Sequence, residues 1–446
     1  MTTKEMITSL EGWRHNGYAL VRHPAIGAIV FLIISLAIYT KGRYAPVGDS
    51  VPQELLPITV IREQNLDFDE FVNQFTEGKS QLPYFFLWKN DHVISFYGIV
   101  PGLLNVPAFL VADWLGMDLV ANRGRITKWT TAVVSALSVA VMFLVSLRVC
   151  SKRLNSVFIS ILYAFATCCW SVTANTLWWN GPSLLFLSIA LLLLVEPQGR
   201  LAPWCGFFLA MAVWNRPTNL ALALPLALYM LIYNHNWKAF LISAAIPAIL
   251  MAWYSHAYWG NVWALGQGHR LQANAFDGSI LNGLAGLLFS PARGLFVYSP
   301  IFLFTVPIFA VTLLGRTATP LCRYLSIGIL LDLLLTAKWH VWWGGWSFGY
   351  RMLIELIPGL TVLLAYAWEQ TIASRRWLQV AFWPTVLVSF YIHFLGAFYY
   401  PSDWNYSPRS VDKASARLWD IKDTELKRLQ AQFNRDLSEG RWPWQH

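Results

Sequence analysis

Asp49 is the first residue along the chain whose type and place suit catalysis. It stands in Gly48-Asp49-Ser50, shortly after an apolar run that ends near residue 40. A carboxylate in such a loop can act as a general base that takes the proton of an acceptor hydroxyl, which then attacks a sugar carbon. Asp is also a preferred helix N-cap, and a helix-like run follows from Glu54. Both interpretations stay open at this point.

Three arginines stand at the ends of apolar runs. Arg216 precedes a proline, Arg293 lies in Ser-Pro-Ala-Arg-Gly, and Arg351 opens an apolar run four residues before Glu355. Taken singly, they are explained by charged ends that reach the water at a membrane interface, or by a local Arg351–Glu355 pair on one helix. Taken as a set, they suit a phosphate group, which guanidinium groups grip with two parallel hydrogen bonds.

The most unusual stretch runs from Lys338 to Arg351, with the sequence Lys-Trp-His-Val-Trp-Trp-Gly-Gly-Trp-Ser-Phe-Gly-Tyr-Arg. Aromatic faces stack on the C–H faces of sugars, and glycines let a backbone approach closely. A membrane-interface belt would explain some of the tryptophans but not the glycines between them. Trp-Trp-Asn-Gly at 178–181 repeats the theme. The candidate sugar- or acceptor-binding residues are Tyr97, Trp179, Asn180, Tyr298, His340, Trp342, Trp343, Trp346 and Tyr350.

The composition identifies the medium in which these residues must be positioned. The 446 residues are 56% hydrophobic and 13% charged, against about 25% charged in a typical soluble domain. A bilayer must therefore cover much of the surface. The net charge of +9 comes without a basic stripe or an RNA-reading motif, so no nucleic-acid partner is expected. The five cysteines lie in or beside apolar runs, with no disulfide or metal-ligand spacing.

Eleven apolar segments are predicted to span the membrane, which makes the fold an all-α bundle of about 11 transmembrane helices. An intramembrane carboxylate, Asp332, lies inside the ninth segment and is a candidate site residue because a buried charge is costly there. The segments are 24–40, 129–148, 154–172, 182–196, 202–214, 218–233, 239–258, 296–314, 321–337, 352–368 and 377–398.

The stretch 93–116 is apolar but interrupted by prolines and by Asp113, and counting it as a span would invert every later helix. Lysines and arginines favour the cytoplasmic side. With 93–116 excluded, twelve such residues face the cytoplasm and five in the shorter outer loops face the other side. The twelve are Lys4, Arg14, Arg22, Arg148, Lys152, Arg153, Arg200, Lys238, Arg316, Arg323, Arg375 and Arg376, and the five are Arg216, Arg270, Arg293, Lys338 and Arg351. We therefore predict a cytoplasmic N-terminus, an outer C-terminus, and juxtamembrane helices at 93–116.

Two long segments then lie outside. The first outer loop covers 41–128 and belongs to a transmembrane domain of residues 1–398. The tail, 399–446, carries Leu426, Leu429, Phe433 and Leu437 at helical spacing among charged residues, which predicts an amphipathic helix. Nearly all of the unusual polar residues share this outer side.

These pieces, in this order, resemble the GT-C superfamily of polytopic glycosyltransferases, in the branch of bacterial protein O-mannosyltransferases and aminoarabinose transferases. The resemblance covers most of the chain. It rests on a set of ordered motifs, in which relatives often have Trp-x-His-Gly-Pro where this chain has Asn180. The motifs are Gly48-Asp49-Ser50, Leu66-Asp67-Phe68-Asp69-Glu70-Phe71, the Ser-x-Tyr element of Ser95 to Tyr97 leading into a run to Pro107, Trp178-Trp179-Asn180-Gly181-Pro182, Arg216-Pro217-Thr218, the run from Gly286 to Leu295, Tyr298-Ser299-Pro300, the run from Trp342 to Arg351, and Leu418-Trp419-Asp420.

The resemblance implies a polyprenyl-phosphate-linked sugar donor and a periplasmic active site in a bacterial inner membrane. Asp49 would be the catalytic residue, the arginines would hold the donor phosphate, and an inverting displacement would transfer the sugar to a glycan, lipid or protein acceptor. Some branches use a divalent metal, for which Asp67, Asp69 and Glu70 are candidates, although a solvated loop face is the simpler explanation.

Three other functions compete with this one. A transporter or flippase for a polyprenyl-linked glycan would use the same arginines and aromatics without forming a bond, but the chain shows no convincing internal repeat. A polymerase or ligase of lipid-linked glycans would be a different enzyme on the same fold. A non-catalytic scaffold would keep only the shell of the fold.

Overall fold

The computed structural model describes residues 23–77, 81–196, 198–264, 275–315 and 319–445. Five basic residues that were used to orient the chain lie outside the described residues, namely Lys4, Arg14, Arg22, Arg270 and Arg316. The described chain is mostly helical, as the sequence predicts for a membrane protein.

Among the described residues, five helical segments are long and apolar enough to cross a membrane by length and composition. They are Arg123–Val149, Trp237–Trp259, Pro320–Lys338, Arg351–Ile372 and Arg376–Tyr399. Large apolar side chains stay exposed along the sides of the bundle, such as Ile242, Ile249, Val380 and Leu387. Exposing such an apolar surface to water is unfavourable in free energy, so these faces fit the apolar interior of a bilayer.

Each of the eleven predicted segments contains helix. The helices of the bundle are α2 (Pro24–Tyr39), α6 (Arg123–Val149), α7 (Arg153–Phe165), α8 (Asn180–Leu194), α9 (Cys205–Asn215), α10 (Leu220–Tyr233), α11 (Trp237–Trp259), α13 (Leu295–Tyr298), α14 (Val306–Leu313), α15 (Pro320–Lys338), α16 (Ile357–Ala367) and α17 (Arg376–Tyr399). Helix α6 packs against α2, α7 and α8, while α15 packs against α10. Helix α12 (Ile280–Phe289), in a predicted outer loop, packs on α15 as well.

Several helices are broken where prolines fall. Pro217 opens a short 3₁₀ turn between α9 and α10, and Pro300 opens another before α14. Proline removes a backbone donor and disfavours helical geometry in the residue before it. Accordingly, Arg216 has extended backbone angles, with φ of −148° and ψ of 110°.

The first outer loop folds into a small layer of its own. It contains α3 (Val51–Arg62), α4 (Val72–Thr76), the strands β1 (Phe86–Lys89) and β2 (His92–Ser95), and α5 (Val100–Trp114). The strands pair antiparallel, with Phe86 opposite Ser95 and Lys89 opposite His92. Asn90 and Asp91 form the turn with positive φ, which these two residue types tolerate. Within the part of the chain that the structure describes, this hairpin is the exception to the predicted all-α fold. Its second strand occupies the first residues of the stretch 93–116, which was predicted as juxtamembrane helices.

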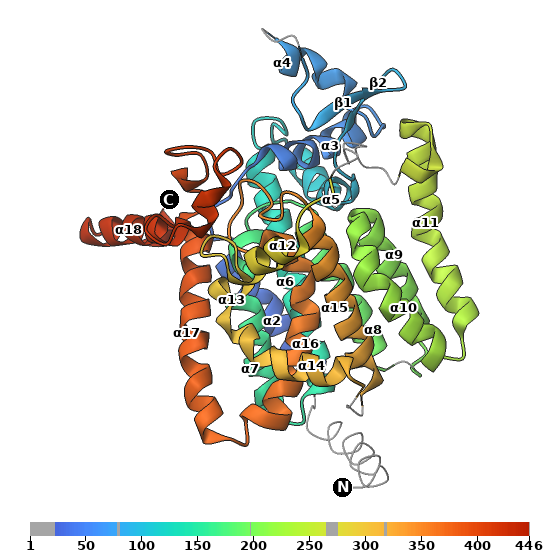
Figure 1. The fold of residues 1–446 in the computed structure, drawn as a ribbon. Coiled ribbons are helices and arrows are strands. Elements are labelled where there is room, and N and C mark those ends of the chain that lie inside the picture. The colour runs from blue at the N-terminus through green and yellow to red at the C-terminus, as the bar shows by residue number, and fades with distance from the viewer. Residues whose placement is uncertain (1–22, 78–80, 197, 265–274, 316–318, 446) are drawn as a thin grey trace.

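The tail contains the predicted helix, α18 (Glu425–Ser438). Leu429 is fully buried, Leu426 and Phe433 pack against the core, and Leu437 is exposed. Figure 1 shows that the first outer loop and the tail lie toward the same end of the bundle, with α18 running across the end of α17. The five cysteines are buried and free.

Candidate active site

Asp49 lies on a short 3₁₀ turn, Gly48–Ser50, that leads into α3. The turn is held by Ser50, whose hydroxyl donates to the Val47 carbonyl at 2.9 Å and accepts from the Val47 amide at 3.2 Å. The residue before α3 is Ser50, and no side chain caps that helix. The capping interpretation of Asp49 is therefore wrong, and its carboxylate is available for other partners.

A buried carboxylate fixes the base of this turn. Glu54 is 3% exposed and accepts hydrogen bonds from Tyr44 at 2.5 Å and from Ser50 at 3.2 Å, and it pairs with Arg123 at 3.3 Å. Burial raises the pKa of the Glu54 carboxyl. These contacts join the turn to α3 and α6.

Asp49 accepts two tyrosine hydroxyls and one arginine. Its Oδ1 accepts from Tyr84 at 2.8 Å and from Tyr97 at 2.7 Å, and its Oδ2 pairs with Arg351 at 2.9 Å. Burial is the main cause that raises the pKa of both tyrosines above the ordinary value of 10.0. Both phenols therefore stay protonated near neutral pH and keep donating to the carboxylate.

The Trp- and Gly-rich stretch from Lys338 to Tyr350, here called the aromatic loop, precedes α16. Arg351 joins this loop to the first outer loop. Its guanidinium carbon lies 3.5 Å from the centre of the Trp178 ring, and Nη1 donates to the Gly344 carbonyl at 3.3 Å. The expected Arg351–Glu355 pair on one helix face is wrong, because Arg351 pairs with Asp49 across 302 residues of sequence. A cation on an indole face, desolvated on one side, is held firmly in place.

Arg216 occupies a neighbouring position, beside the same Trp179 ring as Arg351. The guanidinium carbons of Arg216 and Arg351 lie 5.6 Å and 5.3 Å from the Trp179 ring centre. Arg216 pairs with Glu355 at 2.6 Å, and Asn180 donates to the same carboxylate at 2.8 Å. The structure thus brings two of the three predicted arginines together, one already paired with a buried acid.

Arg293 differs from the other two arginines. Its side chain is 1% exposed and bonds Glu425 at 3.0 Å, Asn405 at 2.6 Å and the Gly345 carbonyl at 3.3 Å. Arg293 therefore does not line the cavity described below. Two of its three partners, Glu425 and Asn405, belong to the tail. Sequence spacing could not predict this because Glu425 lies 132 residues away.

Gly344 and Gly345 form a turn that Arg351 and Arg293 contact, and the backbone angles of this turn require glycine. Gly344 and Gly345 have φ of +71° and +68°, in the left-handed region that favours glycine. Their carbonyls accept from Arg351 and Arg293 respectively. The glycines thus place the aromatic loop between the first outer loop and the tail.

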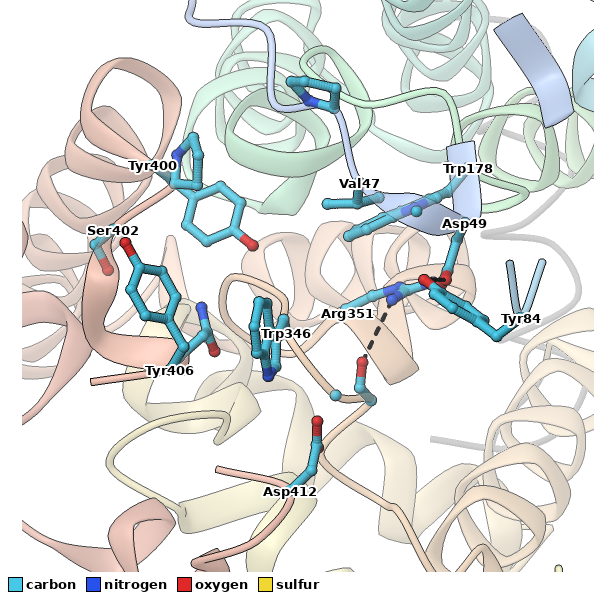
Figure 2. A pocket seen from close by; sticks show the side chains of 16 residues that line it. Val47, Asp49, Tyr84, Trp178, Trp346, Arg351, Tyr400, Ser402, Tyr406 and Asp412 are labelled. Atoms are coloured by element: carbon cyan, nitrogen blue, oxygen red, sulfur yellow. Dashed lines mark hydrogen bonds and ion pairs between the residues drawn. The ribbon is translucent and has the colours of Figure 1, made fainter. Parts of the chain in front are cut away.

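A cavity of about 630 Å³ opens beside Asp49, a size typical of small-molecule sites. Figure 2 shows Trp346 between Tyr406 and Arg351, with Asp49 and Tyr84 beyond the arginine. The lining residues come from the first outer loop, the Trp178 loop, the aromatic loop and the tail. They are Pro46, Val47, Gly48, Asp49, Tyr84, Trp178, Gly344, Gly345, Trp346, Arg351, Tyr400, Pro401, Ser402, Asn405, Tyr406 and Asp412.

Of the predicted site residues, Asp49, Arg351 and Trp346 line this cavity. Tyr97 donates to Asp49, and Trp179 and Asn180 contact Arg351, so these three lie next to lining residues. The others have structural neighbours. Tyr298, Tyr350 and Trp342 are buried, and the Tyr350 hydroxyl lies 2.7 Å from the Ser299 hydroxyl. His340 stacks on Trp339 and lies 3.0 Å from the Ala275 carbonyl, and Trp343 donates to Asp412 at 2.9 Å.

Two acidic groups lie apart from the cavity lining. Asp332 is buried in α15, where its carboxylate interacts electrostatically with Arg216 and Glu355. Asp67 and Asp69 group with His92 rather than with Glu70, and their ligand atoms lie within 4.8 Å of one another. These three donors could hold a divalent cation. In the structure, the His92 ring instead joins the two carboxylates at 3.2 Å and 2.9 Å.

Sequence reasoning missed Tyr84, Trp178, Tyr400, Tyr406 and Asp412. Trp178 stands beside a residue that was selected, and Tyr84 lies in a loop with no pattern that marks it. The three tail residues were missed because the tail sequence predicts only an amphipathic helix, whereas the tail forms one wall of the cavity.

The fold and these features define a helical membrane protein with a polar, aromatic cavity at one end of its bundle. Comparison of the chain with protein-family models, with curated proteins and with solved structures finds no match.

Proposed function

We propose that the chain is a glycosyltransferase that moves a sugar from a polyprenyl-phosphate-linked donor to an acceptor on the periplasmic face of the inner membrane. One observation carries this proposal. A carboxylate and a guanidinium, Asp49 and Arg351, lie 2.9 Å apart on the wall of a cavity rich in aromatic side chains. Sugar transfer from a phosphate needs a base for the acceptor, a cation for the leaving group and aromatic surfaces for the sugar ring.

Asp49 is the proposed base. Its Oδ1 accepts hydrogen bonds from the hydroxyls of Tyr84 and Tyr97, and an acceptor hydroxyl would replace one of these donors when it binds. The hydroxyl then loses its proton to Asp49 while its oxygen attacks the anomeric carbon. The bond from that carbon to the phosphate oxygen breaks on the opposite face, so the configuration at the anomeric carbon is inverted.

Arg351 is the proposed partner of the leaving phosphate. A phosphate group that binds Arg351 competes with Asp49 Oδ2 for the same guanidinium, which leaves the carboxylate free to take the proton of the acceptor hydroxyl. Arg216 lies beside the same Trp179 ring as Arg351 and adds a second positive charge, which the carboxylate of Glu355 partly neutralises. Arg351, which lines the cavity, is therefore the proposed phosphate ligand, Arg216 adds positive charge behind it, and Arg293 anchors the tail.

The proposed topology has eleven spans, a cytoplasmic N-terminus and a periplasmic C-terminus. Two findings support it. Every predicted span contains helix, and the first outer loop and the tail lie toward one end of the bundle, where the cavity is. Helix α9 is short for a span, and it packs against α8 and α11.

The test compares envelope glycans, lipids and glycoproteins by mass spectrometry in cells with and without the gene. We expect one sugar to disappear from one acceptor in the deletion strain and to return with the wild-type gene. An unchanged set of glycans, with the protein produced at normal levels in the complemented strain, contradicts the proposal.

A further inference from the structure

The wall of the cavity that faces Trp346 is built by the C-terminal tail. Tyr400, Ser402, Asn405, Tyr406 and Asp412 all line it. The tail is fixed in this position, because Asn405 donates to Glu425 at 2.9 Å and Arg293 bonds both of them from the bundle. The wall is therefore a preformed surface.

Two large aromatic rings are exposed on this surface. Trp346 is 47% exposed and Tyr406 is 54% exposed, and their ring centres lie 5.5 Å apart with planes tilted by 38°. The indole nitrogen of Trp346 already donates to Ser410 at 3.1 Å, which fixes the ring. Two neighbouring aromatic rings that are about half exposed, one of them held through its nitrogen, suit the C–H face of a sugar.

Asp412 supplies the polar group beside these rings. Its Oδ1 accepts from Trp343 at 2.9 Å, and its side chain forms no ion pair with any described residue. The charged residues that line the cavity are Asp49, Arg351 and Asp412, and Arg351 is already paired with Asp49. The tail side of the cavity therefore carries one uncompensated negative charge.

That charge selects among ligands. An ionised carboxylate accepts hydroxyl donors in hydrogen bonds about twice as strong as those between neutral groups. The same carboxylate repels an anion, which would also lose its water on entering the cavity. A neutral sugar ring satisfies both the aromatic faces and the carboxylate.

We propose that Trp346, Tyr406 and Asp412 form a subsite for a neutral sugar ring of the acceptor, and that Asp412 excludes anionic sugars from it. The assignment to the acceptor rests on the proposed function, because the donor phosphate would occupy the arginine side of the cavity. The binding of a neutral ring at this place does not depend on transfer.

The experiment measures binding of small glycosides to the full-length protein in phosphatidylcholine nanodiscs by ligand-detected NMR. The probes are neutral methyl glycosides of glucose, galactose and mannose, each paired with its uronate, which carries a carboxylate in place of the C6 hydroxymethyl group. Two variants are compared, Asp412→Asn and the control Asp420→Asn. Both remove one exposed tail carboxylate, and Asp420 does not line the cavity.

For the wild-type protein, we expect at least one neutral glycoside to bind at millimolar concentration and its uronate to bind about fivefold or more weakly. Asp412→Asn should weaken the neutral glycoside several-fold and remove the discrimination against the uronate, while Asp420→Asn should change neither. The proposal is overturned if no neutral glycoside binds, if wild-type protein binds the uronate equally well, or if Asp412→Asn keeps the discrimination. A failure of sugar transfer with this pattern intact would overturn the enzyme and leave the subsite.

Discussion

Replacing Asp49 by asparagine separates catalysis from architecture more cleanly than any other change in the chain. Asparagine keeps the size of the side chain and an oxygen that accepts from Tyr84 and Tyr97, but it lacks the charge that pairs with Arg351. A positioned general base contributes about 10²- to 10⁴-fold to rate. We therefore expect transfer to fall by that factor.

The effect of Asp49→Asn on folding should be much smaller. Breaking a fully buried ion pair costs about 3–5 kcal/mol. Here the Asp49 side chain is 18% exposed beside an open cavity, and Arg351 keeps the Gly344 carbonyl and the Trp178 face. We expect the free energy of unfolding to fall by about 1–2 kcal/mol, in the range of one hydrogen bond to a charged group.

The assay measures the product identified by mass spectrometry, with equal amounts of folded protein, and the melting temperature in detergent is recorded in parallel. Asp113→Asn is the matched control, because Asp113 is an exposed carboxylate of the same outer loop outside the cavity lining. Transfer by Asp49→Asn above about a tenth of the wild-type rate would refute the assignment of Asp49 as the base. If the variant unfolds, Asp49→Glu restores the charge and must recover part of the melting temperature and of the transfer.

Three other predictions follow from ion pairs. Arg216→Ala should lower the free energy of unfolding by about 3 kcal/mol, because it leaves the Glu355 carboxylate buried, and adding Glu355→Gln should recover part of that loss in thermal denaturation; equal melting temperatures for the wild-type and Arg216→Ala proteins would refute it. Arg293→Ala should release the tail, measured as faster proteolysis after residue 400, and an unchanged cleavage rate would contradict the anchoring role. The hydrogen bond from His92 to Asp69 raises the pKa of His92, so its contribution to loop stability is full below the unfolded value near 6.5 and is lost as pH rises through the folded pKa. Exchange at the loop amides should therefore speed up from pH 6 to 8 beyond the intrinsic rate, and His92→Gln should abolish that change; equal pH dependence in both proteins would argue against it.

The helical architecture could be predicted from the sequence because apolar length is a local property. The segment that became α6 is marked by its own residues, and so is the amphipathic helix of the tail. The hairpin of β1 and β2 was missed because its eight residues are too few to show a pattern against the apolar residues around them.

The site could be predicted only in part, because its contacts join distant segments. Asp49 and Arg351 were each identified as candidates, but nothing in the sequence shows that they pair. Arg293 was predicted to bind phosphate, but in the structure its charge is neutralised by an ion pair with Glu425 of the tail. Which side chains neutralise one another is decided by packing.

Glycosyl transfer by this protein is measured most directly in proteoliposomes that contain the purified protein, isolated lipid-linked sugar and the acceptor identified in cells. We expect a new covalent bond between sugar and acceptor and release of polyprenyl phosphate with the wild-type protein, and about 100-fold less of both products with Asp49→Asn. Movement of the intact lipid-linked sugar across the bilayer without any new glycosidic bond would contradict it and would identify the protein as a transporter.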